Sequence, residues 1–496
     1  MAAGVFEGAI SVPGEARVLR SGAVGIWDST VIAISSTAPA YSLAASMAAM
    51  VIAVGFTSPL VVALAFLPVM GIAVAFLYLN RVRQDCGTTF LWVGEALHPA
   101  AGFISGWASL SAGVLFMVSA SSLAGSYSLN LLGQLGWIAA ARVQDQTLVA
   151  VIGSLWFALV TFMVVYGITA AARFQRVPLA LEYVIVLVFA LIGLGKAYSH
   201  QPLRGSRHID APWFSPTHIG GLSSFAAGAV IAVFFFWGWD TAANINEESA
   251  NAAQNPGRAG VYSMFALLGI FIVGVLALQT VLSQASIGGS GDVLAVFAAT
   301  IVPKPWNYLM TLAVLSSTVA TLQTTLLPAS RVTLSMARER VFPGVFAHID
   351  PRFRTPMFGT LLVAALSFAG LAAGVKASSV QIFLTNSVNQ VGVLVSLYYG
   401  LTGLACTWYF RRILFRNLKT FLLVGLFAGG GGLFMLGLST WNVINTIQSS
   451  GSGWDTEKPV LYSLALGIPA LAVAWYRNPQ FFRRPVSAYD PASELV

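Results

Sequence analysis

The chain has 496 residues, of which 57% are hydrophobic and only 9% are charged. Soluble domains usually carry about 25% charged residues, so this composition excludes an ordinary soluble domain and predicts an all-α polytopic membrane protein. A formal net charge of +8 would suggest nucleic-acid binding in a soluble protein. Here we attribute the excess to membrane topology and expect no nucleic-acid partner.

Twelve segments are apolar and long enough to cross the bilayer, which takes about 20 helical residues. In chain order they are 24–53, 57–80, 101–132, 147–169, 178–199, 221–246, 259–283, 306–336, 356–375, 380–410, 419–440 and 459–476. With the N-terminus in the cytoplasm, 19 of the 26 basic residues lie inside, as the positive-inside rule requires. We therefore expect a plasma (inner) membrane protein with cytoplasmic tails at residues 1–23 and 477–496, and no cleaved signal peptide.

Polar, helix-breaking residues interrupt the first and the sixth of these spans. They are Ser35, Ser36, Thr37 and Pro39 in the first span, and Trp237, Gly238 and Asp240 in the sixth. Because the bilayer has no water to satisfy freed backbone groups, such breaks survive only around an enclosed cavity. Paired breaks in corresponding positions of two halves indicate the binding site of a secondary transporter.

The two breaks also divide the chain into repeats. Residues 24–199 hold spans 1 to 5, and residues 221–410 hold spans 6 to 10. An odd number of spans per repeat inverts the second repeat relative to the first. We therefore expect a 5+5 inverted repeat with broken helices 1 and 6, followed by two C-terminal helices in residues 411–476.

Each break has two interpretations. In span 1, freed amides and the positive start of the second half-helix suit a carboxylate, although a simple proline kink explains the same residues. In span 6, Asp240 is an acid inside the membrane, which is a functional hypothesis by default. Asp240 either receives a substrate ammonium group or caps the half-helix that restarts after Gly238. The surrounding aromatic residues form a lid over the substrate or pack in the core.

Two further polar features lie inside the spans. Glu182, four residues into span 5, is either a proton carrier or a helix-start residue paired with Arg173 or Arg176. Span 8 carries a cluster of hydroxyl groups that includes Ser316, Ser317 and Thr321. Such hydroxyls ligate sodium or form hydrogen bonds between helices. The histidines are dispersed in loops and no metal spacing or phosphate-binding motif is present, so we expect no enzyme, cofactor or metal.

Several short motifs extend from span 3 to the start of span 9. They are Gly102-Phe103 and Gly106-Trp107, then Phe235-Phe236-Trp237-Gly238-Trp239-Asp240 with Glu247-Glu248 and Asn255-Pro256-Gly257-Arg258, and finally Ala329-Ser330-Arg331, Met336-Ala337-Arg338 and Thr355-Pro356. In these motifs the chain resembles the amino acid–polyamine–organocation family of permeases, which have the leucine-transporter fold. The resemblance covers most of the chain.

The resemblance implies a substrate held between the two breaks. In such permeases the carboxylate of an amino acid meets free amides of span 1, and its ammonium group meets free carbonyls of spans 1 and 6. Carried over, these positions are Ser35, Ser36 and Thr37 in span 1 and Phe235, Phe236 and Trp237 in span 6.

The chain departs from the family pattern in two places. Many members have a Gly-Ser-Gly type of break in span 1, whereas the break here contains no glycine, which leaves room for amines or other small organic cations. In several proton-coupled relatives a span-5 lysine bonds to span 1, and Glu182 occupies that region here. A glutamate there is itself the proton carrier or pairs with an amine substrate.

These observations predict a proton-coupled symporter or exchanger of amino acids or related amines that works by alternating access. The coupling ion is H⁺ or Na⁺, since a sodium-coupled amino acid symporter is one alternative. An amine or polyamine carrier is another. A passive channel or a membrane sensor is a different class, and a channel would conduct without saturation or counterflow.

Overall fold

The computed structural model describes residues 19–143, 145–166, 168–199, 203, 205–374, 380–448 and 451–490. These residues form helices and connecting loops and no β-strand. Most of the predicted N-terminal tail, 1–23, lies outside them. Nine helical stretches in the described part are long and apolar enough to cross a membrane. The chain is therefore a multi-pass membrane protein.

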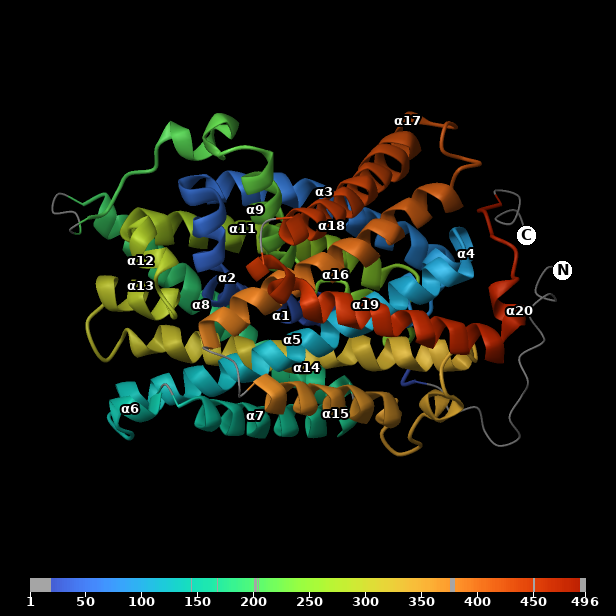
Figure 1. Cartoon of the computed structure of the whole chain (residues 1–496), viewed down its shortest axis with the longest axis horizontal. Helices are drawn as coiled ribbons and strands as arrows, with labels where there is room; N and C mark the ends of the chain where they lie inside the picture. The colour runs from blue at the N-terminus through green and yellow to red at the C-terminus, as the bar shows by residue number, and fades with distance from the viewer. Residues whose placement is uncertain are drawn as a thin grey trace.

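The long helices pack side by side along one direction, and α5 and α14 run along most of the bundle (Figure 1). The long unbroken helices are α3 (Ser58–Val82), α5 (Pro99–Gln134), α7 (Gln146–Tyr166), α8 (Ile168–Ala197), α11 (Asn255–Val281), α14 (Tyr308–Arg338), α15 (Met357–Gly374), α16 (Val380–Tyr409), α18 (Gly430–Gln448) and α19 (Gly451–Arg477). The short helices at the ends include α4 (Thr89–Ala96), α12 (Gln284–Gly288), α13 (Val293–Ile301) and α20 (Pro479–Phe482). In Figure 1, α4 and α20 lie at the opposite end of the bundle from α12 and α13.

The count of twelve spans stays a prediction. The first apolar stretch, Ile26–Val82, is 57 residues long and turns at Gly55, so its length suits spans 1 and 2 together. Leu222–Phe235 and Met357–Ala373 are apolar but shorter than the other spans. They are the places where spans 6 and 9 were expected.

Both predicted helix breaks are present. The half-helices on either side of them are α1 (Ile26–Thr37) and α2 (Pro39–Val54), then α9 (Leu222–Phe235) and α10 (Thr241–Asn244). Ala38 interrupts the first pair in the left-handed conformation, with φ at 50°. Pro39 begins α2, a position where its missing N–H leaves no hydrogen bond unmade. Gly238 interrupts the second pair with φ at 113°, a conformation that favours glycine.

The two broken helices lie antiparallel to each other. The half before the first break, α1, packs against α10, which follows the second break. The half after the first break, α2, packs against α9, which precedes the second. An inverted repeat predicts this exchange of partners, and the complete 5+5 repeat over 24–199 and 221–410 remains a prediction.

Beyond α19 the chain turns back across the end of the bundle. The Ser487 N–H donates to the Glu95 carbonyl oxygen at 2.7 Å, and the Tyr489 N–H donates to the Tyr409 carbonyl oxygen at 2.9 Å. The predicted C-terminal tail, 477–496, is therefore packed on α4 and α16 as far as it is described. Its last six residues lie outside the described part.

Candidate functional site

A small cavity lies where the two breaks meet. Its lining comes from α1, α5, the α9–α10 break, α14 and α16, and includes Ser36, Trp237, Gly238, Asp240, Thr325 and Tyr398. Asp240 is the only carboxylate among the described lining residues, and none of them is lysine, arginine or histidine. Asp240 is therefore the only residue of this lining that can carry a negative charge, and no basic residue of the lining can offset that charge.

The two breaks touch through their backbones at Ser36 and Gly238. A Cβ atom on Gly238 would lie 2.7 Å from the Ser36 carbonyl carbon, a distance that side chains do not tolerate. The Ser36 hydroxyl shares a hydrogen bond of 2.8 Å with the Thr241 hydroxyl. The Thr321 hydroxyl donates to the Ser36 carbonyl oxygen at 2.6 Å. Ser36 therefore joins both breaks to α14, and its carbonyl already has a donor.

Asp240 faces a pair of aromatic hydrogen-bonding groups. Its Oδ2 accepts from the Tyr398 hydroxyl at 3.0 Å, and that hydroxyl accepts from Trp237 Nε1 at 2.5 Å. The Asp240 side chain makes no cap hydrogen bond to α10. The alternative expectation, in which this side chain caps the restarting half-helix, is therefore wrong. Asp240 has helical backbone angles (φ −66°, ψ −14°), whereas a capping residue usually adopts the extended region.

Glu182 of α8 reaches the start of α2. Its side chain is completely buried, and Oε1 accepts from the Ala40 N–H at 2.7 Å. The carboxyl group also lies beside the Ser317 hydroxyl, whereas Oε2 has no hydrogen-bond partner of normal geometry. The next amide of α2, that of Tyr41, donates to the Ser317 hydroxyl at 3.2 Å. A carboxylate and a hydroxyl of the protein therefore hold the first two N–H groups of α2.

The alternative in which Glu182 pairs with Arg176 is also wrong. Arg176 Nη2 lies 2.5 Å from Oδ1 of Asp28, on α1. Residues six apart on a helix do not share a face, so Arg176 points to the surface while Glu182 points into the bundle. The side chain of Arg173 lies outside the described residues.

The other predicted residues of span 1 and span 8 differ in their surroundings. Ser35 is buried and its hydroxyl has no partner. The Thr37 hydroxyl donates to the Ala33 carbonyl oxygen of its own helix at 3.1 Å, as in the simple-kink interpretation of that residue. Ser316 is only partly buried, so it differs from Ser317 and Thr321, which both contact the first break.

The aromatic residues of the second break divide into two groups. The side chains of Phe235 and Phe236 pack against Phe271 of α11, with ring centroids 5.1 and 5.5 Å apart. Trp237 lies instead against Phe116 of α5, at 5.1 Å, and lines the cavity. The side chains of Phe235 and Phe236 therefore belong to the packed core, whereas that of Trp237 lines the cavity.

Sequence reasoning missed Tyr398, which holds Asp240 and Trp237 together. The available signal was the pair Tyr398-Tyr399 within an apolar span, because a tyrosine hydroxyl buried there needs a partner. Periodicity does not indicate which buried carboxylate that partner is.

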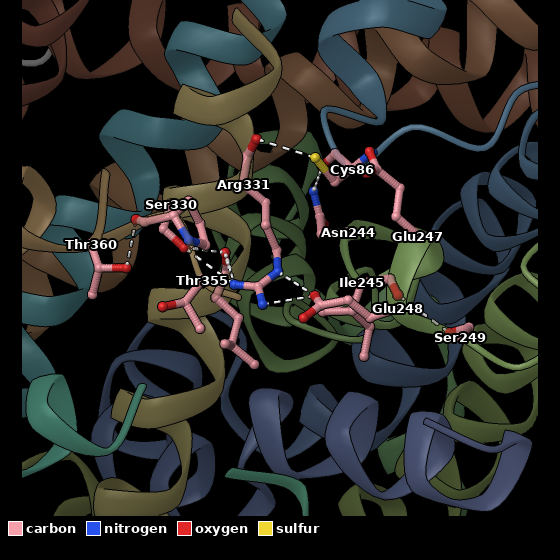
Figure 2. A network of polar contacts seen from close by, with 12 residues as sticks. Cys86, Asn244, Ile245, Glu247, Glu248, Ser249, Ser330, Arg331, Thr355 and Thr360 are labelled. Atoms are coloured by element: carbon pink, nitrogen blue, oxygen red, sulfur yellow. Dashed lines mark hydrogen bonds and ion pairs between the residues drawn. The ribbon is translucent and has the colours of Figure 1, made fainter. Parts of the chain in front are cut away.

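A second polar network joins the chain just before α4, the chain just after α10, and α14 (Figure 2). Glu248 and Arg331 are completely buried and form an ion pair of 2.7 Å between Arg331 Nη2 and Glu248 Oε2. Cys86 donates to the Arg331 carbonyl oxygen at 3.5 Å. The Glu248 backbone carbonyl accepts from the Val24 N–H at 3.1 Å. The network therefore joins the residues before α1, the chain after α10, and α14.

The neighbouring residues Asp85, Cys86 and Glu247 form the kind of cluster that can bind a metal, with ligand atoms within 4.8 Å of one another. Arg338 Nη1, however, donates to both carboxylate oxygens of Glu247 at 2.8 and 3.0 Å. Burial raises the pKa of the Cys86 thiol well above its ordinary value, which keeps the sulfur protonated. A guanidinium and a neutral thiol suit an ion-pair network better than a metal ion.

The pKa values of the two carboxyl groups in this cluster shift in opposite directions. Burial, and then the charge of Glu247, raise the pKa of Asp85. Burial also acts to raise the pKa of Glu247, but the adjacent Arg338 guanidinium outweighs it and holds that pKa below its ordinary value. The Arg338 guanidinium therefore favours the ionised form of Glu247. Burial and the charge of Glu247 disfavour the ionised form of Asp85.

Two interrupted helices around an intramembrane acid are typical of membrane transport proteins. The sequence profile of the family described as amino acid permease matches residues 24–469. The chain belongs to this family, within the amino acid–polyamine–organocation permeases whose motifs it carries, and the family consists of transporters rather than enzymes.

Three relatives illustrate the range of the family. The methylthioribose transporter of Bacillus subtilis (strain 168) is 23% identical over 214 residues, 43% of this chain and 43% of the relative. The low-affinity putrescine importer PlaP of Escherichia coli (strain K12) is 24% identical over 357 residues, 69% of this chain and 71% of the relative. The vacuolar cationic amino acid transporter 4 of Arabidopsis thaliana is 26% identical over 218 residues, 42% of this chain and 34% of the relative. The match thus spans less than half of the first and third relatives.

Proposed function

We propose that the protein is a secondary active transporter of amino acids or related amines, a proton-coupled symporter or exchanger that works by alternating access. The observation that carries the proposal is the meeting of two broken helices around a cavity that contains Asp240. The names of the relatives, a putrescine importer and a cationic amino acid transporter among them, support small nitrogenous substrates.

The proposed architecture has twelve spans in a 5+5 inverted repeat, with spans 1, 2, 6 and 7 moving against spans 3, 4, 8 and 9. We place the protein in the plasma membrane, with both termini and the end that carries α4 and α20 in the cytoplasm. The excess of basic residues in the segments predicted to be cytoplasmic supports this orientation. The buried pair of Glu248 and Arg331 would then close the cytoplasmic end of the pathway.

In the proposed site, Asp240 receives the ammonium group of the substrate. Trp237 and Tyr398 orient this carboxylate and cover it, as their hydrogen bonds support. Ser36 and Gly238 keep the two breaks in contact. Phe235 and Phe236 contribute only backbone carbonyls, since their side chains pack against α11.

We assign the coupling proton to Glu182. It is a completely buried acid without an ion-pair partner among the described residues, and it contacts the start of α2. Gain or loss of its proton would therefore act directly on the first break. The sodium alternative needs several free oxygen ligands, but Ser317 and Thr321 are already hydrogen-bonded to that break.

The test is uptake into proteoliposomes that contain the purified full-length protein, with radiolabelled amino acids and diamines. We expect saturable uptake, counterflow, and accumulation driven by an imposed proton gradient and abolished by a proton ionophore. Accumulation driven by a sodium gradient alone would replace the proton with sodium as the coupling ion. Conductance without saturation or counterflow would overturn the transporter mechanism in favour of a channel.

A further inference from the structure

The start of α2 lies inside the bundle and has the properties of an anion site. The N-terminal N–H groups of a helix have no partners within the helix and carry a partial positive charge. In interrupted membrane helices, such ends typically face the anionic group of a substrate. Pro39 has no N–H, so the first available donors of α2 are those of Ala40 and Tyr41. The next amide, that of Ser42, already bonds to the Ala38 carbonyl oxygen at 2.9 Å.

The protein itself fills this anion site. Glu182 Oε1 takes the Ala40 N–H at 2.7 Å, and the Ser317 hydroxyl takes the Tyr41 N–H at 3.2 Å. The second Glu182 oxygen is buried without a hydrogen-bond partner of normal geometry. A carboxylate arriving with a substrate would find both amides engaged, and it would meet Glu182 as a like charge.

The cavity between the two breaks, which Asp240 lines, also favours a cation over an anion. Among the described lining residues, Asp240 is the only charged group and no basic side chain faces it. An isolated carboxylate in such a place is costly unless it is protonated or paired with a positive charge. An organic ammonium group supplies that positive charge, whereas a zwitterion also brings a carboxylate with no counter-charge to meet it.

We propose that Glu182 is a specificity-determining residue, a built-in carboxylate that occupies the start of α2 in place of a substrate carboxylate. The preferred substrate is then a primary amine or diamine without an α-carboxylate, whose ammonium group contacts Asp240. This inference rests on the proposed transport function and narrows its substrate class. It is compatible with proton coupling, because the same carboxyl group can fill the amide site and titrate.

The first test compares ligands that differ only in the carboxylate. The purified full-length protein is titrated with lysine, lysine methyl ester and cadaverine, and with ornithine and putrescine, and dissociation constants are measured by calorimetry. We expect each amine and the ester to bind about tenfold or more tightly than the matching free amino acid, since a carboxylate buried without a partner loses at least about that factor in affinity. Equal or tighter binding of the free amino acids would overturn the inference and leave the transport function standing.

The second test exchanges Glu182 for residues that differ in hydrogen bonding. Glu182→Ala frees the Ala40 N–H, and we expect the affinity for each amino acid, relative to that for its matching amine, to rise about tenfold. Glu182→Gln removes the like charge but keeps an acceptor oxygen for that N–H, so we expect a smaller gain than in Glu182→Ala. Equal gains in both variants, or a gain in neither, would contradict the assignment of Glu182 as the surrogate carboxylate.

Two outcomes separate this inference from the function on which it rests. If none of these ligands binds or is transported by the wild-type protein, the proposed substrate class of amino acids and amines is itself overturned. If Glu182→Ala does not fold, the wild-type comparison of each amino acid with its ester and its amine still decides the question. An ester that binds no better than its parent acid counts against the proposal.

Discussion

Gly238 lies so close to Ser36 that a Cβ atom on the glycine would stand 2.7 Å from the Ser36 carbonyl carbon. We expect Gly238→Ala to separate the two breaks, because alanine also disfavours the φ of 113° at this position. Transport should fall at least about tenfold and the melting temperature should drop. Gly437→Ala is the matched control, since that site has space for a Cβ and an ordinary φ. Wild-type transport by Gly238→Ala would show that the close approach is not needed.

Substitution of Asp240 should impair transport much more than folding. Asp240→Asn keeps the side-chain volume and an acceptor for Tyr398 but removes the charge that faces the substrate. We expect kcat/KM for uptake to fall by about 10- to 100-fold, with a small change in melting temperature. Tyr398→Phe, which keeps the carboxylate, should have a smaller effect. Unchanged uptake kinetics in Asp240→Asn would remove Asp240 from the substrate site.

Glu182→Gln should separate energy coupling from substrate exchange. The neutral amide cannot carry a proton, but its oxygen can still accept from the Ala40 N–H. We expect the variant to lose accumulation driven by a proton gradient and to retain counterflow, both measured in proteoliposomes. Gradient-driven accumulation at the wild-type level would eliminate Glu182 as the proton carrier.

The stability of the protein should fall when one partner of the Glu248–Arg331 ion pair is removed. Glu248→Gln leaves the guanidinium buried without its counter-charge, which typically costs about 3–5 kcal/mol of stability. The double variant Glu248→Gln with Arg331→Met should recover part of this loss. Maleimide labelling of Cys86, which is buried beside the pair, should accelerate in the single variant. A single variant as stable as the wild type, with a protected Cys86, would contradict this role.

Asp85 and Glu247 should give opposite dependences of stability on pH. Because the pKa of Asp85 is raised in the folded state, its ionised form disfavours folding. Asp85→Asn should therefore raise the melting temperature at pH 7, and the gain should disappear as the pH falls and the wild type takes up its proton. The asparagine oxygen can still accept from the Gly87 N–H and the Ser335 hydroxyl, which donate to Asp85 Oδ1 at 2.7 Å each.

Glu247→Gln is the counterpart, because the pKa of Glu247 is lowered in the folded state. Its ionised form favours folding at neutral pH, so this variant should be less stable than the wild type there. The difference should narrow as the pH falls below the ordinary glutamate value of 4.5. Thermal unfolding from about pH 3 to about pH 8 measures both variants, and shifts of the same sign at neutral pH would contradict the opposite pKa directions.

The all-helical membrane architecture and both breaks were predictable because apolar length and helix-breaking residues are local signals. Pro39 and Gly238 mark their own positions, and the breaks lie where these residues stand. The short helix α4 was missed because its eight residues are too few for a span and follow a polar loop. Periodicity alone does not separate such a helix from a connection.

The partners within the site were less predictable, because they come from distant parts of the chain. Glu182 was recognised as an unusual acid, but the sequence offered Arg176, six residues away, rather than Ala40, 142 residues away. Asp240 was likewise recognised, while its partner Tyr398 lies 158 residues further on. A buried polar group indicates that a partner exists, and only the packing of the helices selects it.

The backbone hydrogen bonds of Ser487 and Tyr489 fasten the C-terminal segment to α4 and α16. This strap, residues 478–490, thus crosses the end of the bundle. A truncation after Arg477, at the point where apolar character ends, would remove this strap and uncover Phe90 and Phe410, against which Phe481 and Tyr489 pack. Fluorescent reporters and purification tags should therefore follow Val496. Shortened versions of the protein should retain every residue up to Asp490 if they are to keep this end of the bundle closed.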